Sequence, residues 1–543
     1  MKKRLTPHIE YIKGFFAITL MKVLPLTLIH LVLACSPQQE KSSDQQSINL
    51  SDEVTIAEIQ EAYHNGTYSI TDVTNFYLKR IQNIDQNGIA LNSVLTINPE
   101  AMNIAAILDQ EMLNGDIRGP LHGIPVLLKD NIDTGDEMPC TAGSIVMKDA
   151  YPQKDSPLAA QLRAAGAVIL GKTNLSEWAN FHSTYSSSGW SSLGGQTKNP
   201  YDLTRNPCGS SAGSGVAVSA NLCVIAIGTE TNGSIVCPST SNGIVGIKPT
   251  VGLVSRTGII PISFTQDTGG PMARTLTDAV ICLGALTAVD SADRKTLSQD
   301  RVAYQDYTAF LNENGISGKR LGFYKSRLND NQRLTEVIQE AITFFESKGA
   351  TIIELDEFLN KDTEPHSFKL MLYEFKDGLN RYFQQLGDNS PIKNLEELID
   401  RTLNDSLEMR YFDHALLKQA QDKGNLQEEE YLEALQKARD LSRTEGIDKV
   451  MNEYQLDAII APTGSPAWKT DLTNGDHYTI YSSSPAAIAG YPNITVPMGQ
   501  IDGLPVGISI FGRPWSEPKL IEIAYGFEQG TKHRFSPGFS SGL

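Results

Sequence analysis

The sequence predicts an α/β protein in which a largely parallel sheet is covered by helices on both faces. A short apolar strand at 124–128 is followed by a helix at 157–165, a second apolar strand at 167–170 and a further helix from Ser176. Short apolar runs of this kind are typical of strands buried on both faces, and the β-α-β order favours parallel pairing. The 543 residues, 40% hydrophobic and 20% charged, are enough for one large globular domain or two to three ordinary ones.

Two helices are expected ahead of the first strand. Residues 55–58 (Thr-Ile-Ala-Glu) have the spacing of a capping box, and the helix that they open stops at Asn65-Gly66. Residues 69–72 open a second helix. Its apolar face is formed by Val73, Phe76, Tyr77 and Ile81.

The remainder of the chain divides by composition. Residues 194–271 are rich in Gly, Ser, Thr and Pro, and because short apolar runs interrupt them we expect tight turns rather than disorder. A helix is expected at 333–348. Residues 358–454 are helical and heavily charged, which is typical of solvated helix faces. Further strands are expected at 319–324, 351–355, 456–461, 494–497 and 506–511.

The first 51 residues have the features of an export signal and a tether. From Met21 to Cys35 a lysine is followed by an apolar stretch, which is typical of a secretory signal and too short to span a membrane readily. The small residue before Cys35 resembles a bacterial lipobox. We therefore expect 1–35 to be the signal peptide of an exported bacterial lipoprotein, lipidated on Cys35 and either periplasmic or membrane-anchored. A plain signal peptide and an uncleaved anchor are the alternatives, and Met21 is a second candidate start. The polar residues 36–51 are typical of a flexible tether.

The bulk composition limits the partners. A formal net charge of -17 argues against a nucleic-acid-binding surface and indicates a soluble protein. We expect a monomer that touches membranes only through its N-terminal lipid. Beyond Cys35, an odd number of cysteines without C-x-x-C spacing supports neither a disulfide framework nor a zinc site, and we expect buried free thiols. These cysteines are Cys140, Cys208, Cys223, Cys237 and Cys282.

Residues 208–215 (CGSSAGSG) contain the pattern G-x-S-x-G of an α/β-hydrolase nucleophile elbow, with Ser211 as the nucleophile. An elbow serine follows a buried strand, but the residues before Cys208 are nearly all polar or turn-forming, and no HGGG-type motif precedes them. We therefore do not expect Ser211 to be the nucleophile. P-loop and dinucleotide-binding motifs are absent from the sequence. None of the histidines that could act as its base lies in a compelling setting: His366, His414, His477 and His533.

A second glycine-rich turn follows at 227–238 (IGTETNGSIVCP). Here the buried run 223–227 does lead into the turn, which contains a single serine, Ser234. Three consecutive amides just before this serine could converge on an anion, as an oxyanion hole requires. The residues alone leave open the alternative that both segments are only tight glycine turns. The three amides belong to Thr231, Asn232 and Gly233.

Together the two segments resemble the amidase signature family, whose pattern is G-G-S-S-G-G-S followed by G-T-D-x-G-G-S-I. A lysine after a G-I-P strand (123–130) also matches, and the resemblance covers nearly everything from about residue 52 to the C-terminus. It implies one amidase domain at 52–543, with a helical insertion at about 358–454. The implied α/β fold has a central mixed, twisted sheet covered by helices on both faces. Further matching motifs lie at 245–258, 266–274, 461–464, 490–497 and 503–508.

The resemblance places a Ser–cis-Ser–Lys triad on Ser234, Ser210 and Lys129. Ser234 would attack the amide carbonyl and become acylated, Ser210 would carry its proton to Lys129, and the amides of residues 231–233 would form the oxyanion hole. No metal or cofactor is implied. Because lysine is a base only when neutral, burial must lower its pKa, which nearby Asp130 and Asp133 would oppose if they faced it. The supporting residues would be Gly209, whose bond to Ser210 would be cis, Ser211 and Glu230.

Two positions depart from the family pattern. Asn232 replaces a glycine, and Val236 replaces an arginine that can pair with the acidic residue, here Glu230. Neither position is a triad side chain, so we still expect activity. The residues around Glu230 and Cys237 resemble the peptide amidase branch, whose members hydrolyse the C-terminal amide of peptides. The insertion could shape the cleft for such a substrate.

Three other functions remain open. The glutamine-hydrolysing amidotransferase that makes glutaminyl-tRNA has a subunit with the same triad, but that protein is cytosolic and works with partner subunits, which the signal sequence argues against. A fatty acid amide hydrolase would need a long apolar channel, for which the sequence offers no convincing segment. A non-enzymatic binding module is disfavoured because all three triad residues are present. We therefore expect an amidase that releases acid and ammonia from a small-molecule or peptide amide.

Overall fold

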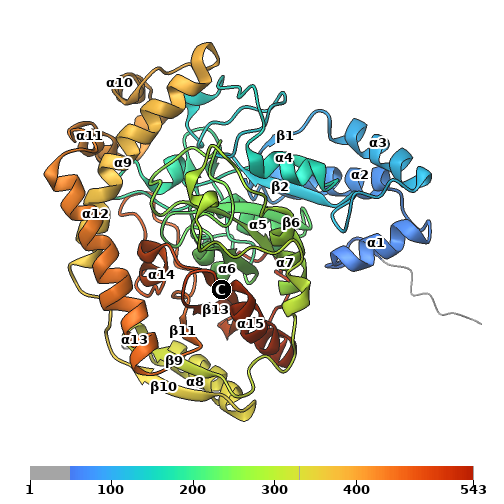
Figure 1. Cartoon of the computed structure of the whole chain (residues 1–543). Helices are drawn as coiled ribbons and strands as arrows, with labels where there is room; N and C mark the ends of the chain where they lie inside the picture. The colour runs from blue at the N-terminus through green and yellow to red at the C-terminus, as the bar shows by residue number, and fades with distance from the viewer. Residues whose placement is uncertain (1–48, 329–330, 542–543) are drawn as a thin grey trace, which may run out of the picture. The chain divides into compact units, whose positions relative to one another are not determined.

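A mixed sheet of 11 strands runs through the part of the chain that the computed structural model describes, residues 49–328 and 331–541 (Figure 1). Across the sheet the strands are, in order, β1 (Val94–Ile97), β3 (Val168–Thr173), β2 (Pro125–Lys129), β6 (Ile225–Glu230), β8 (Thr268–Ala273), β7 (Val245–Lys248), β12 (Asn493–Ile501), β13 (Leu504–Phe511), β11 (Ala458–Pro462), β9 (Arg320–Tyr324) and β10 (Thr351–Leu355). β2 is parallel to β3 and β6, and β9 is parallel to β10 and β11. The other neighbouring pairs are antiparallel.

This topology confirms the mixed sheet that the family resemblance implies. It also corrects the expectation of a largely parallel sheet, which rested on the local β-α-β rhythm of β2 and β3. The two parallel groups are joined by β8, β7, β12 and β13, which pair antiparallel with their neighbours. The sequence of β8 (TGGPMA) hides this arrangement, because glycine and proline are uncommon inside strands.

The first three expected helices form. α1 (Ile56–His64) and α2 (Ile70–Arg80) begin after Thr55 and Ser69, and each N-terminus carries a complete capping box. α4 (Pro157–Ala164) connects β2 to β3 and so completes the β-α-β unit that the sequence predicts.

The helix expected from Ser176 does not form. In its place is the short turn η3 (Glu177–Asn180), in which Trp178 and Ala179 have φ values of 51° and 53°. These left-handed conformations cannot continue a right-handed helix. The Trp178 side chain is buried against the edge of Phe383, with ring centroids 6.5 Å apart, so packing rather than helix propensity decides the local backbone.

The helical insertion lies along one side of the molecule (Figure 1). Its longest helix, α9, packs beside α12 through Leu370, Tyr373, Tyr431 and Ala434. On its other side α9 contributes Phe375 to an apolar cluster that includes residues of η3. The expected solvated faces are therefore only the outer half of these helices. The helices of this region are α9 (Thr363–Leu386), α10 (Leu395–Asn404), α11 (Ala415–Gln421), α12 (Glu429–Ser442) and α13 (Asp448–Glu453).

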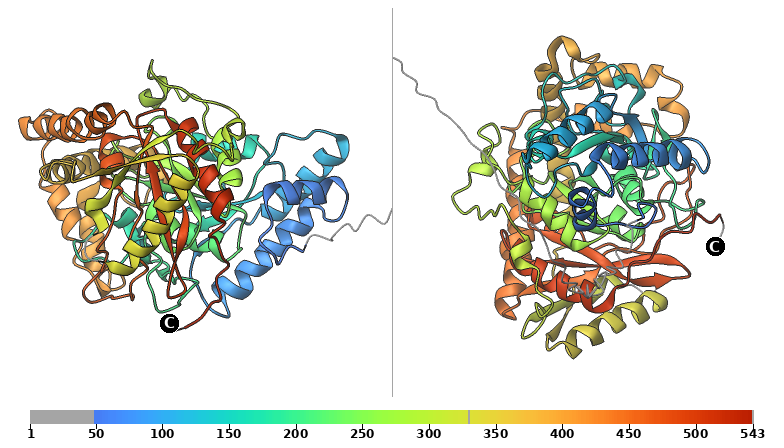
Figure 2. Two further views of the ribbon diagram at one scale, coloured as in Figure 1. Left: turned by 90° about the horizontal axis from the view of Figure 1, so that it is seen from below. Right: turned by 90° about the vertical axis from the view of Figure 1, so that its right-hand side faces the viewer.

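Helices cover both faces of the sheet (Figure 2). The expected helix at 333–348 is confirmed as α8, and the helix after the first serine cluster begins at Ala212. The remaining helices are α3 (Ala101–Asn114), α5 (Ala212–Ser219), α6 (Val236–Ser241), α7 (Leu276–Ala285), α8 (Gln332–Ser347), α14 (Ser484–Ala489) and α15 (Glu517–Thr531).

The N-terminal expectations fall largely outside the described residues. The predicted signal sequence, Cys35 and the tether as far as residue 48 belong to that part of the chain. At the end of the predicted tether, Leu50 is buried in the main apolar core. Within residues 49–328 and 331–541, no helix combines the length and the apolar character that crossing a membrane requires.

Candidate active site

Lys129 ends β2, and its side chain is completely buried. Its Nζ lies 2.7 Å from Ser210 Oγ, 2.9 Å from Thr229 Oγ1 and 3.3 Å from the Thr229 carbonyl oxygen. Burial lowers the pKa of Lys129 from 10.5 to about 7, because an ammonium ion is poorly solvated in the protein interior. A neutral amine, which can accept a proton, is therefore accessible near neutral pH.

Two carboxylates partly oppose this effect, and they are not the two that the sequence suggested. Asp267 and Glu230 raise the pKa of Lys129 through their negative charges. Asp130 and Asp133 are engaged elsewhere: Asp130 accepts a hydrogen bond from Thr141, and Asp133 accepts one of 2.8 Å from Tyr382. Desolvation outweighs the attraction of the carboxylates, so the net shift of the lysine pKa is downward.

Ser210 and Ser211 have different environments although they are adjacent. The peptide bond between Gly209 and Ser210 is cis, and the Ser210 hydroxyl faces Lys129. The Ser211 hydroxyl donates to the Thr229 carbonyl at 3.0 Å and accepts from the Thr229 amide at 3.2 Å. Ser211 is fully buried, and its hydroxyl is committed to holding β6 in place.

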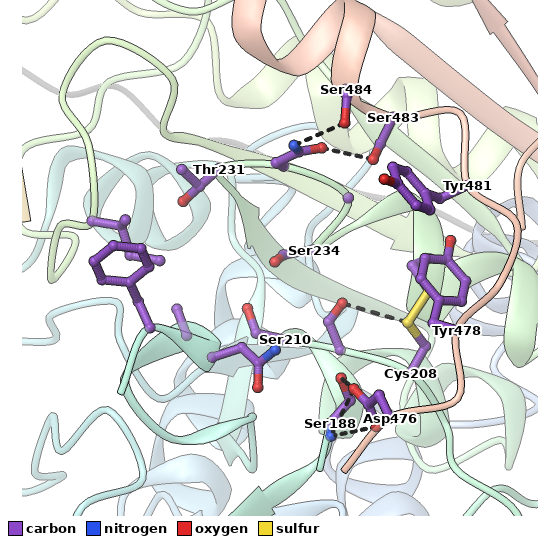
Figure 3. Close-up of a pocket in the computed structure, with 18 of the residues that line it drawn as sticks. Ser188, Cys208, Ser210, Thr231, Ser234, Asp476, Tyr478, Tyr481, Ser483 and Ser484 are labelled. Atoms are coloured by element: carbon purple, nitrogen blue, oxygen red, sulfur yellow. Dashed lines mark hydrogen bonds between the residues drawn. A yellow bond between two sulfur atoms is a disulfide. The ribbon is translucent and has the colours of Figure 1, made fainter. Parts of the chain in front are cut away.

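Ser234 is the most accessible of the three serines, 9% exposed compared with 1% for Ser210 and 0% for Ser211. It follows the turn after β6, and its side chain points into a cavity close to Ser210 (Figure 3). Among the described residues, its hydroxyl has no hydrogen-bond partner and the amides of residues 231–233 have no backbone acceptor. These groups are free to bind a reacting carbonyl.

The two departures from the family pattern have local compensations. The Asn232 side chain accepts a hydrogen bond of 2.7 Å from Ser483 and donates one of 3.2 Å to Ser484, which ties the turn to the start of α14. Glu230, with no arginine at 236, accepts the amides of Ile235 at 2.8 Å and Val236 at 3.1 Å. The acidic side chain thus caps the beginning of α6.

One expectation about the cysteines is wrong. Cys208 and Cys237 form a disulfide, whereas Cys140, Cys223 and Cys282 are buried free thiols as expected. Sequence spacing gave no sign of the bond, because its two cysteines lie 29 residues apart and become neighbours only when the serine segments fold against each other. Both cysteines line the cavity, so the disulfide is part of its wall.

The cavity has a volume of about 420 Å³. One wall is aromatic: the Trp468 ring lies 5.2 Å from Tyr478, which stacks on Tyr481 at 5.8 Å (Figure 3). This wall could not be predicted from the sequence, since its residues come from a loop between β11 and α14 that carries no motif. Helix α9 of the insertion provides another wall, as expected for a segment that shapes the cleft, through Glu364, Ser367, Phe368 and Met371.

The arrangement is suited to acyl transfer. A buried amine touches one serine hydroxyl, a second and freer hydroxyl lies nearby, and three amides converge beside it. A base, a nucleophile and donors for a developing oxyanion are the groups that such a reaction needs.

The chain belongs to the amidase signature family, because a family model described as "Amidase" matches residues 72–521. The structure of native peptide amidase from Stenotrophomonas maltophilia is 47% identical, with a TM-score of 0.87 over 90% of this chain and 99% of that one. A probable amidase of Arabidopsis thaliana is 39% identical over 90% of this chain and 92% of its own. A glutamyl-tRNA(Gln) amidotransferase subunit of Caldanaerobacter subterraneus is 32% identical over 89% and 98%. The protein is accordingly a hydrolase of amide C–N bonds.

Proposed function

We propose that the protein hydrolyses the C-terminal amide of peptides, releasing the free acid and ammonia. The observation that carries the proposal is the cavity beside Ser234, whose volume of about 420 Å³ exceeds what a small amide needs. Its aromatic and α9 walls offer apolar contacts to peptide side chains. The likeness to peptide amidase adds support, including a structure of that enzyme in complex with the competitive inhibitor chymostatin, at 47% identity.

In the proposed mechanism Ser234 is the nucleophile. Its proton passes to Ser210, whose own proton passes to neutral Lys129, while Ser234 Oγ bonds to the amide carbon. The carbonyl oxygen, now negative, is held by the amides of residues 231–233. Collapse of this intermediate breaks the C–N bond, and the departing nitrogen takes a proton from Lys129 through Ser210, leaving as ammonia. Water then attacks the acyl-enzyme by the same proton route.

Ammonia release from a peptide amide tests the roles of the serines. Ser234→Ala removes the nucleophile, and we expect a fall in kcat of at least about 10⁴-fold. Ser211→Ala is the matched control: it removes a hydroxyl that only positions β6, and we expect a loss of about tenfold. Full activity in Ser234→Ala, measured after circular dichroism has shown that both variants are folded, would overturn the assignment.

A panel of amides tests the substrate class separately. We expect kcat/KM for peptide amides to exceed that for free glutamine and for long-chain fatty acid amides by at least about 100-fold. A preference for glutamine would instead indicate a function like that of the glutamine-hydrolysing amidotransferase. A preference for fatty acid amides would indicate a lipid amidase. Either result would refute the peptide proposal and leave the triad assignment intact.

A further inference from the structure

A second cluster of polar groups lies outside the cleft, where the insertion meets η3. Glu177 belongs to η3 and His182 follows it, while Glu408 and His414 come from the segment between α10 and α11. All four side chains are buried. One ligand atom each from Glu177, His182 and His414 lie within 4.8 Å of one another. None of the four residues lines the cavity beside Ser234.

The two imidazoles are placed as a pair of metal ligands would be. Their Nδ1 atoms are 3.3 Å apart, and two nitrogens bound to tetrahedral zinc at 2.0–2.1 Å stand about 3.3 Å from each other. The His414 Nε2 lies 2.9 Å from the Glu408 carbonyl oxygen, so Nε2 carries the proton and Nδ1 keeps its lone pair. A backbone carbonyl that fixes a histidine in this way is typical of the surroundings of bound metals.

The carboxylates separate this arrangement from a plain hydrogen bond between two rings. Glu177 accepts the Ser192 amide with one oxygen at 2.6 Å, and Glu408 accepts the Ser144 hydroxyl with one oxygen at 2.5 Å. The other oxygen of each is buried and has no hydrogen-bond partner among the described residues.

No lysine or arginine of the described chain forms a salt bridge with either carboxylate; the single charged contact is His414 Nε2, 3.9 Å from Glu408 Oε2. Burial, reinforced by the charge of Glu408, raises the pKa of Glu177 well above its usual value. Two buried carboxylates without a cationic partner are costly, and one divalent cation would neutralise both.

We propose that Glu177, His182 and His414, with Glu408 as the fourth ligand, bind one divalent transition-metal ion of the class that zinc represents. Imidazole and carboxylate together are ligands that such ions accept, and four protein ligands leave no open position for catalysis. The sequence shows no metal-binding spacing here, because the two histidines are 232 residues apart.

The site would fasten the insertion to the wall of the cleft. The amide of Leu416 in α11 donates to the His182 carbonyl at 3.0 Å, so the two segments already meet at this point. Phe181, next to His182, lines the cavity beside Ser234. A metal ion here would hold that wall in position without taking part in the chemistry.

Cobalt(II) titration of the purified full-length protein, after treatment with a chelator, tests the proposal directly. Four-coordinate cobalt absorbs visible light much more strongly than six-coordinate cobalt. We expect such bands to saturate at one equivalent and to disappear when zinc is added. A wild-type protein that develops no such bands, or that binds cobalt only with octahedral spectra, would overturn the proposal without bearing on the amidase activity.

Variants locate the site. His414→Gln should weaken cobalt binding at least 100-fold, and zinc should raise the Tm of the wild type but not of this variant. His64→Gln, in which an exposed histidine of α1 is replaced, is the matched control and should bind cobalt as the wild type does. Equal cobalt affinity in folded His414→Gln and in the wild type would contradict the assignment.

Discussion

Lys129 shows how a single residue is adapted to its role by its surroundings. Burial lowers its pKa to about 7, while Asp267 and Glu230 limit the shift through their negative charges. The hydroxyl of Thr229 lies within 2.9 Å of the amine and holds it toward Ser210. The amine is thus poised to gain and lose a proton near neutral pH, as a general base requires.

This environment predicts the pH dependence of activity. Protonated Lys129 cannot accept a proton, so kcat/KM should fall about tenfold per pH unit below a midpoint near pH 7 and level off above it. Asp267→Asn removes a charge that raises the lysine pKa, and we expect the midpoint to move to lower pH. Asp130→Asn, whose charge is not among those that shift Lys129, should leave the midpoint in place. Rate profiles from pH 5 to 9 would show this, and an alkaline shift in Asp267→Asn would contradict it.

The sequence was informative about residues inside motifs and silent about their neighbours. Lys129, Ser210 and Ser234 were singled out from local patterns and the family resemblance, and the structure places them around one cavity. Thr229 and Asp267 were missed, because their importance depends on distances across the sheet that no spacing encodes. The disulfide was missed for the same reason.

Among the elements, the two glycine-rich serine segments act as one unit. Cys208 stands just before the cis bond, Cys237 lies in α6, and their disulfide joins the segment of Ser210 to that of Ser234. The amide of Ser211 also donates to the Ser234 carbonyl at 3.1 Å. The relative position of the two serines is therefore secured both covalently and by hydrogen bonding.

Loss of the disulfide should destabilise the protein. For a loop of 29 residues, the loss of loop-closure entropy in the unfolded chain is worth about 3–4 kcal/mol. The double variant Cys208→Ala, Cys237→Ala should unfold at a clearly lower urea concentration than the oxidised wild type. Dithiothreitol should lower the wild-type midpoint toward that value and leave the double variant unchanged. Equal midpoints for the double variant and the oxidised wild type would contradict this.

Helix α9 was expected from sequence as part of a charged insertion, and its charge pattern concealed its second face. Outward positions are polar, but Phe368 and Met371 face the cavity. The tight turn η3 could not be predicted, because packing of Trp178 against Phe383 overrides the helical signal after Ser176. Cleft walls made by an insertion and a loop depend on tertiary contacts, so sequence periodicity identifies the elements without their function.

The inner face of α9 provides a test of how the substrate is held. Phe368→Ala removes an apolar surface from the proposed peptide-binding region, and we expect KM for peptide amides to rise about tenfold with kcat nearly unchanged. KM for a small amide such as acetamide should stay the same, since it does not reach this wall. Leu403→Ala, at an exposed position of α10 outside the cavity, is the control. A fall in kcat for both substrates would mean that α9 supports the triad instead.

At the scale of the whole molecule, the two ends of the described chain meet the core at one place. Asn221, after α5, donates to the carbonyls of Leu50 at 3.3 Å and Asp52 at 3.0 Å. Glu53 forms an ion pair with Arg534 near the C-terminus. The carbonyl of Val54 accepts a hydrogen bond of 2.8 Å from buried Arg274. The residues just before α1 are therefore a structural part of the compact unit that extends from Ile48 to Leu543.

Two truncations should consequently behave differently. A chain that starts at Ile48 keeps every contact of the compact unit, and we expect it to match the full chain in Tm and in ammonia release. A chain that starts at Ile56 loses the buried side chains of Leu50 and Val54 and exposes the partners of Arg274 and Arg534. Burial of two such side chains is worth about 3–6 kcal/mol, so this chain should melt several degrees lower and lose soluble yield. Thermal unfolding of the two proteins, with ammonia release at 25 °C as the functional readout, decides the matter: equal melting temperatures would show that the segment before α1 does not support the fold.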